Sequence, residues 1–402
     1  MQTAQRAFAM LTGFLATGLA AAGGPLAIDS NGEPFTWGTA TEIQYRTDGG
    51  PLSETVNNSD AIARVASMFD FWENVPSASI GYHRAGPMQD VGAFTDGDVN
   101  TAVEFNAVDG SCGNGVQSPI VFDEDGSLFE DLGQDPDVIG FAGPCAIDGS
   151  GRILAGIAVL NGLFQDGIES VDNPELGSVA FDAAFVHEFG HFSGLEHSQI
   201  NIECADGSCS PDDEAGLPTM FPFLVTEEQR TLSDDDIAWI SRLYPSGGAA
   251  THGTISGTVY FSDGESQLQY ANVIARRVDA GGNEDRRSAA SAVSGYRFRV
   301  CSPNPITEPP AEFCPPIGSL NPGHIGLFEI PVPPGSYTIE IEGIDPLFTG
   351  GSSVGPADFP LALPGAAPGP LGPITVGAGQ TATGNDFILI GTPPRFDQFE
   401  GP

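Results

Sequence analysis

The chain has 402 residues, of which 14 are basic and 53 acidic, so its formal net charge is −39 at pH 7. Such an acidic surface repels nucleic-acid phosphates and anionic lipid heads, so we expect neither nucleic acid nor direct adsorption to a membrane among its partners. The length suggests about two domains, because domains usually contain ~100 to 200 residues.

Residues 1–22 have the features of a secretory signal peptide. Arg6 precedes an apolar run that ends near Leu19, and small residues follow it. The run is shorter and more interrupted than the roughly 20 strongly apolar residues that span a bilayer, and no later stretch is long enough. We therefore expect a secreted, extracellular protein without a transmembrane segment.

The six cysteines fit an oxidising compartment, because they fall into three couples that are close in the sequence. Six cysteines allow 15 pairings, so proximity alone favours this one. The expected couples are Cys112 with Cys145, Cys204 with Cys209, and Cys301 with Cys314.

A short segment, residues 23–34, leads into the first predicted domain at 35–245. β-Branched and aromatic residues predict strands, whose ranges are 35–51, 77–86, 101–108, 118–123 and 152–162. Apolar residues at helical spacing predict helices over 52–75, with Ser59 or Asp60 as N-cap, over 181–192, and over 232–245, with Ser233 as N-cap.

Residues 246–253 are small and flexible, as expected of a linker. A second domain is predicted at 254–391, with residues 392–402 as a tail. Its expected strands lie at 254–261, 271–279, 295–302, 326–344 and 382–391, and residues 359–373 are a proline-rich loop. Strands at these intervals without helical periodicity indicate an all-β sandwich.

Three of the six histidines lie within eleven residues, in the segment FVHEFGHFSGLEHS. His187 and His191 are four apart, so a helix places both imidazoles on one face. Gly194 permits a sharp turn after the helix, which can bring His197 round as a third ligand. Glu188 would lie beside the ion without binding it.

Three neutral imidazoles leave a fourth tetrahedral position open, which is typical of catalytic zinc. Glu188 would then be the general base that takes a proton from the zinc-activated water during peptide-bond hydrolysis. Two alternatives remain at this point. The histidines could fill polar corners of a core, or they could hold a zinc ion without catalysing a reaction.

The pattern His-Glu-x-x-His-x-x-Gly-x-x-His resembles the signature of the metzincin metalloproteases, and Met220 lies where that family has its methionine turn. The segment TMFP and the predicted helix after Ser233 are similar to the matrixin branch, over residues 35–244. The resemblance implies an α+β fold, in which a catalytic domain with a twisted mixed sheet and three helices precedes the β-sandwich.

The sequence departs from the matrixin pattern at the structural metals. Val121 stands at the usual zinc-binding histidine and Gly126 at a usual glutamate, so no structural zinc is expected. Asp123 and Asp125 are candidate ligands of a structural calcium ion, on the evidence of a partial Asp-x-Asp-Gly motif. Since no cysteine precedes Cys112, latency through a prodomain cysteine is not expected either.

Residues 254–391 resemble the carboxypeptidase-regulatory-like or transthyretin-like sandwiches of secreted bacterial enzymes. Such a module could stabilise or space the enzyme, or contact a surface or glycan. Taken together, the sequence predicts a secreted zinc endopeptidase that acts on protein or peptide substrates. The alternative is a non-catalytic surface- or matrix-binding protein that retains the metzincin fold.

Overall fold

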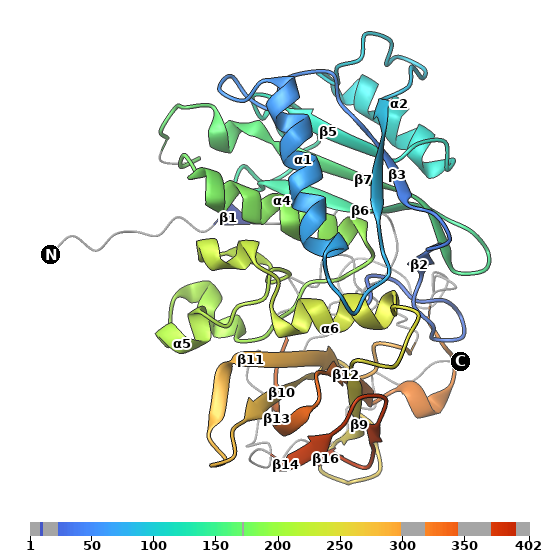
Figure 1. The fold of residues 1–402 in the computed structure, drawn as a ribbon, viewed down its shortest axis with the longest axis vertical. Coiled ribbons are helices and arrows are strands. Elements are labelled where there is room, and N and C mark those ends of the chain that lie inside the picture. The colour runs from blue at the N-terminus through green and yellow to red at the C-terminus, as the bar shows by residue number, and fades with distance from the viewer. Residues whose placement is uncertain (1–8, 11–22, 171–172, 299–317, 345–370, 391–402) are drawn as a thin grey trace, which may run out of the picture.

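The computed structural model describes residues 9–10, 23–170, 173–298, 318–344 and 371–390. Over these residues the protein is a mixed α/β structure with several sheets and few helices, compatible with the α+β class expected from the sequence. Figure 1 shows the largest sheet and its helices at one end and a group of smaller sheets at the other, with helix α6 between them.

The largest sheet has six strands in the order β2-β7-β5-β3-β4, with β6 added antiparallel to β7. The other pairings in this sheet are parallel. Its strands are β2 (Thr36–Trp37), β3 (Ile43–Thr47), β4 (Tyr82–Pro87), β5 (Pro119–Asp123), β6 (Gly140–Ile147) and β7 (Arg152–Asn161). The strands predicted at 118–123 and 152–162 are confirmed, whereas the run predicted at 35–51 forms two short strands.

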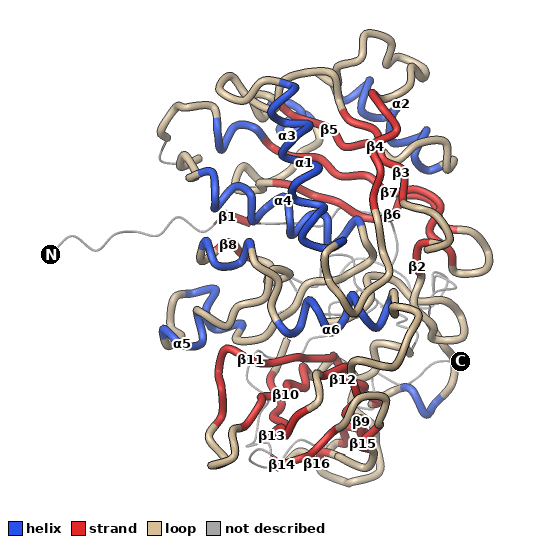
Figure 2. The backbone as a smooth tube through the Cα atoms, viewed as in Figure 1, coloured by secondary structure: helices blue, strands red, loops and turns tan. Residues whose placement is uncertain are grey.

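The helices are α1 (Asn58–Glu73), α2 (Ala102–Gly113), α3 (Ser127–Asp131), α4 (Ser178–Phe192), α5 (Pro211–Glu214) and α6 (Asp234–Leu243), with the short 3-10 turns η1 (Gly162–Gln165), η2 (Ile202–Asp206), η3 (Glu227–Arg230) and η4 (Pro322–His324). Figure 2 separates these from the strands. Helices α1, α4 and α6 lie at the three ranges predicted to be helical, and three further α-helices, α2, α3 and α5, were not predicted. Ser233 caps α6 as predicted, but the N-cap of α1 is Asn57, whose side chain accepts from Asp60 N.

The strand predicted at 101–108 is wrong, because these residues begin helix α2. Thr101 caps the helix by accepting from Glu104 N, and the Glu104 carboxylate accepts in return from Thr101 Oγ1 and also from Asn100 N. Phe105, Val108 and Cys112 then fall on one buried helical face. A reciprocal cap at the N-terminus thus outweighs the β-branched residues that suggested a strand.

The chain from residue 253 forms two four-stranded sheets, which we call the C-terminal sheets. One has the order β11-β10-β13-β14, and in the other β9 pairs with β12, β15 and β16. Their strands are β9 (Gly253–Tyr260), β10 (Asn272–Val278), β11 (Glu284–Val293), β12 (Leu327–Val332), β13 (Gly335–Glu342), β14 (Leu371–Val376), β15 (Thr381–Ala382) and β16 (Phe387–Ile388).

One strand prediction for this region is wrong, and the predicted proline-rich loop lies mostly outside the described residues. Residues 294–297 form a turn after β11, so the strand predicted at 295–302 is wrong over the residues described. Of the proline-rich stretch, residues 359–370 lie outside the described residues, and 371–373 belong to β14.

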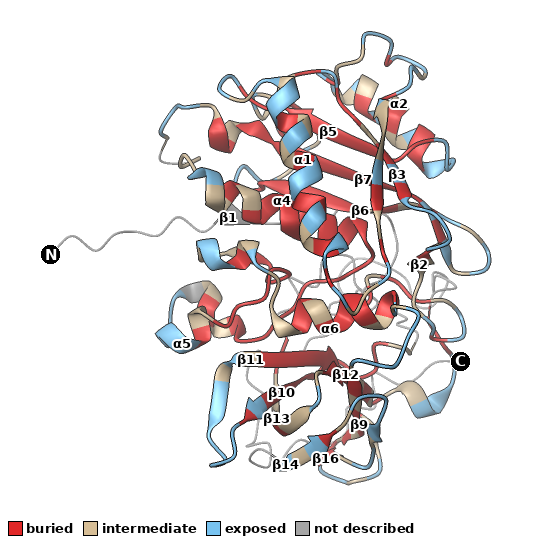
Figure 3. Ribbon diagram, in the orientation of Figure 1, coloured by how far each residue is buried: buried red, intermediate tan, exposed pale blue. Residues whose placement is uncertain are grey.

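One continuous buried cluster joins the large sheet, its helices and the C-terminal sheets. It runs from Trp37 through Trp239 of α6 to Leu389, and Figure 3 shows buried residues on both sides of α6. The linker predicted at 246–253 therefore connects two regions that share their core.

The disulfides Cys112–Cys145 and Cys204–Cys209 confirm two predicted couples and are compatible with secretion. Cys301, Cys314 and the tail at 392–402 lie outside the described residues. Most of the predicted signal peptide does too, except that β1 (Ala9–Met10) pairs with β8 (Phe223–Leu224). Among the helices that the structure describes, none is long and apolar enough to cross a membrane.

Candidate metal centre

Helix α4 supplies the first two histidines. His187 and His191 are one turn apart in its last half, and both are buried. The helix ends at Phe192, and Gly194 follows with φ 92°, a left-handed conformation that favours glycine. After this turn Leu195 N donates to Gly190 O at 3.0 Å, and the chain reverses to bring His197 back over the helix.

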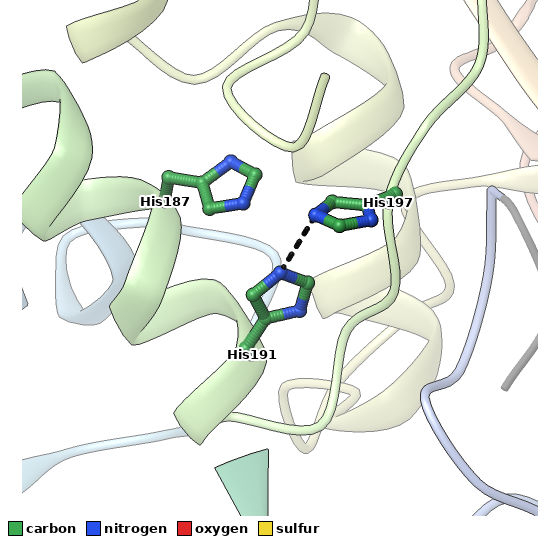
Figure 4. A group of neighbouring side chains, drawn as sticks. All are labelled: His187, His191 and His197. Carbon is green, nitrogen blue, oxygen red and sulfur yellow. Dashed lines mark hydrogen bonds between the residues drawn. The ribbon is translucent and has the colours of Figure 1, made fainter. Parts of the chain in front are cut away.

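The three imidazoles converge on one point, as Figure 4 shows. One ligand atom from each ring lies within 4.8 Å of the others. The ring centroids are 4.6 to 5.1 Å apart, and the Nε2 atoms of His191 and His197 are separated by 3.1 Å. The structure therefore brings together the three histidines that the sequence predicted, which form a group able to bind a metal ion.

Backbone carbonyls fix the orientation of two of the rings. His187 Nδ1 lies 2.8 Å from Thr219 O, and His191 Nδ1 lies 2.8 Å from Leu195 O. A proton on Nδ1 makes both hydrogen bonds, which leaves the Nε2 lone pairs directed toward the shared centre. For His197 the neighbour of Nδ1 is the buried carboxylate of Glu196, at 3.4 Å.

Burial keeps the rings of His187 and His191 neutral. It lowers the pKa of His187 well below its ordinary value, with His191 and His197 adding to the effect, and it lowers the pKa of His191 to about 4. A neutral imidazole is the form that binds metals. The buried Nε2 of His187 has no hydrogen-bond partner. Such an atom costs free energy unless a ligand satisfies it, so the donor set fits a metal ion.

Glu188 lies on the side of α4 that faces strand β6. Both of its carboxylate oxygens are buried without a hydrogen-bond partner, and burial raises its pKa well above the ordinary value. A Cβ added at Gly140 would lie 2.8 Å from Glu188 Cγ. Glycine at position 140 therefore lets β6 approach the helix closely enough to enclose this carboxyl group.

The predicted methionine turn lies directly beneath the histidines. A Cβ added at Gly190 of α4 would collide with Met220 Sδ, so the sulfur packs against the bare helix backbone. Met220 O accepts from Ser198 N at 2.7 Å, next to His197. The preceding residue, Thr219, is the one whose carbonyl orients His187. The turn thus contacts both ends of the ligand set.

Helix α6 holds this turn in place through Asp236, whose carboxylate accepts from Thr219 N at 2.9 Å and from Met220 N at 3.1 Å. Sequence reasoning missed this role, because an aspartate in the first turn of a helix is already explained by capping. It also missed Thr219 and Glu196. The signal that could have found Glu196 is its position directly before a predicted ligand.

The candidate calcium residues lie apart from the histidines, at the last residue of strand β5 and in the turn that follows it. Asp123 Oδ2 accepts from Phe129 N at 2.9 Å, and Asp125 Oδ1 accepts from Ser127 N at 3.0 Å. Within the described ranges, the histidine triad is the only group of three or more His, Cys, Asp or Glu residues whose ligand atoms converge. A calcium ion at this turn stays a prediction.

Compared with the models of protein families and with curated proteins, the sequence matches none of them. The interpretation of the centre therefore rests on its own geometry.

Proposed function

We propose that this protein is a secreted, zinc-dependent endopeptidase of the metzincin type. The observation that carries the proposal is the convergence of three buried imidazoles on one point, with the buried Glu188 next to His187 in the same helix. The methionine turn under the helix and the two disulfides add support.

His187, His191 and His197 would hold the metal through their Nε2 atoms. When bound, a zinc ion supplies Lewis-acid catalysis and makes a water molecule acidic near neutral pH. Burial raises the pKa of Glu188 above its ordinary value, which is the direction that favours a carboxylate as general base. Its carboxylate would take a proton from the attacking water at one Oε atom and deliver it to the leaving amine.

The complete burial of the histidines and of Glu188 favours a second candidate, a secreted protein that binds metal without catalysis. In the described conformation a peptide reaches Glu188 only if a covering segment moves. A buried site that a substrate cannot reach fits a metal ion that stabilises the fold. The two candidates share the metal and differ in the chemistry of Glu188.

The deciding experiment compares the protein from residue 23 onward with its Glu188→Gln variant, for zinc content and for cleavage of unstructured casein. We expect one zinc ion in both and a hydrolysis rate roughly 10²- to 10⁴-fold lower in the variant, the usual contribution of a general base. Glu54→Gln is the control, because Glu54 is exposed and the same charge is lost there.

The outcomes separate the two candidates. A Glu188→Gln variant as active as the wild type would remove Glu188 from the mechanism. Zinc in both proteins without cleavage by either would favour the non-catalytic candidate. If neither protein bound zinc, both candidate functions would be contradicted.

A further inference from the structure

The loop that follows His197 is enclosed on two sides. Ser198, Gln199, Ile200 and Asn201 are all fully buried. On one side Ser198 N donates to Met220 O, as described above. The next three residues face the C-terminal sheets, which the sequence suggested as a separate module.

Each of these three residues contacts a different residue of strand β10, and one of them also contacts the adjacent strand β11. Gln199 O accepts a hydrogen bond from Asn272 Nδ2 at 3.2 Å. Asn201 Oδ1 accepts from Arg276 Nη2 at 2.7 Å. Between them, the side chain of Ile200 forms a small buried cluster of its own with Ile274 and Ala289.

The three contact residues of β10 are spaced by two, at positions 272, 274 and 276. Side chains alternate along a strand, so Asn272, Ile274 and Arg276 lie on the same face. All three are fully buried. One face of β10 therefore contacts the loop residue by residue, in order, over the whole stretch from 199 to 201.

A second connection reaches the centre through α6. Ser291 of β11, which pairs with Ile274, donates from its N–H to Asp235 Oδ1 at 2.7 Å and accepts from Trp239 Nε1 at 2.8 Å. The next residue of α6, Asp236, is the one that holds the Met220 turn. Both structures that flank His197 are thus attached to the same pair of strands.

Contacts from outside the loop secure its end. Asn201 has φ 58°, a left-handed conformation that asparagine adopts more readily than most residues other than glycine, and it is held by Arg276 and by its own hydrogen bond from Nδ2 to Asp213 O at 3.2 Å. A metal ligand carried on a loop needs support to within about 0.5 Å of its productive position.

We infer that the C-terminal sheets are part of the metal centre, and that Asn272, Ile274 and Arg276 are positioning residues for His197. The inference rests on metal binding as in the proposed function. It predicts that the face of β10 that carries these three side chains sets the zinc affinity. Side chains on the opposite face should affect only the stability of the fold.

Ile274→Ala and Ile339→Ala test this as a matched pair. Both isoleucines are fully buried in the C-terminal sheets, and Ile339 of β13 pairs with Ala275, whose side chain lies on the other face of β10. Zinc affinity is measured on the folded full-length mature protein by competition with a chelating indicator, alongside urea unfolding. The visible absorption spectrum of the cobalt-substituted protein reports the ligand geometry.

We expect Ile274→Ala to bind zinc about 10-fold more weakly, as for loss of an outer partner of a ligand, and to change the cobalt spectrum. Ile339→Ala should lose a similar amount of stability and keep the wild-type affinity and spectrum. Asn272→Asp, which replaces the donor to Gln199 O by an acceptor, should resemble Ile274→Ala. If the alanine variants do not fold, Ile274→Val and Ile339→Val give the same comparison.

Equal zinc affinities in Ile274→Ala, Ile339→Ala and the wild type would overturn the inference and leave the proposed function intact. A wild-type protein that binds no zinc would instead contradict the proposed function itself. The two failures are therefore distinguishable.

Discussion

The histidine centre and the Asp123–Asp125 turn are both groups of side chains of the types that bind metals, but their candidate ligand atoms have different hydrogen-bond partners. At the turn, each carboxylate accepts a backbone N–H of the residues that follow, Phe129 and Ser127. In the histidine centre, backbone carbonyls accept from the Nδ1 atoms of His187 and His191, the Nε2 atoms of His191 and His197 lie 3.1 Å apart, and the Nε2 atom of His187 has no partner.

The difference shows which property of a motif predicts a metal site. A carboxylate that stabilises its own turn has a structural reason to be there without an ion. A buried imidazole nitrogen with no partner has none, because burying it costs free energy that only a ligand recovers. Whether the ligand atoms already have hydrogen-bond partners therefore predicts a metal site better than the residue types do.

The largest expected effect comes from removing a ligand. His197→Ala should lower zinc affinity by more than the roughly 10- to 100-fold typical of an outer partner, because a direct bond to the metal is lost. Asp125→Ala should leave zinc affinity unchanged. Isothermal titration of both metal-free variants with zinc checks this, and an equal loss in the two would break the distinction between the sites.

A smaller effect is expected from the packing beneath the histidines. There a change from glycine to alanine within a helix should lower the stability of the protein, although such a change usually raises it. Gly190→Ala should destabilise the protein by about 1 to 3 kcal/mol, because the new methyl group collides with Met220 Sδ and lies 2.9 Å from Trp72 Cζ2. Urea unfolding measures the change. At Gly110 of α2 an added Cβ meets nothing within 4 Å, so Gly110→Ala should stabilise by up to about 1 kcal/mol. Stabilisation by both would contradict the close packing of Met220.

The third expected effect concerns pH at the aspartate turn. Burial raises the pKa of Asp123 to about 6, above its ordinary value of 3.8. A carboxyl whose pKa is raised on folding contributes stability that is fully present below pH 3.8 and is lost as the pH rises through 6. Asp123→Asn should therefore remove about 2 kcal/mol of pH dependence between those values, measured by urea unfolding at several pH values.

Unfolding of the same variant in the presence of calcium gives the outcome that would contradict this comparison. If calcium restored the stability of the wild type at pH 7 and had no effect on Asp123→Asn, the turn would be a metal site after all, and the comparison between the two sites would fail.

Much of the candidate site could be predicted because it is local. His187, Glu188, His191 and His197 lie within eleven residues, so helical periodicity and one glycine turn fix their relation. The helices at α4 and α6 and the strands at β5 and β7 were predictable for the same reason. Each has a clear apolar pattern or a clear cap.

The parts that sequence reasoning missed depend on distant residues. β11 reads EDRRSAASAV, with few β-branched residues, and is a strand because β10 pairs with it and α6 covers it. β6 contains Gly140 and Pro144, which argue against a strand, yet it pairs along β7. The contacts of Thr219 and Asp236 with the centre likewise join segments that are far apart in the chain.

The contact between Asn272 and Gln199 spans 73 residues, and that between Arg276 and Asn201 spans 75. A chain synthesised from its N-terminus has therefore made all three histidines well before it makes the strand that covers their loop. Until β10 and β11 emerge, Ile200 has no apolar partner from those strands, and a truncated chain would expose it to proteases and chaperones. The order of synthesis thus delays the burial of the loop after His197 until the strands that cover it have been made.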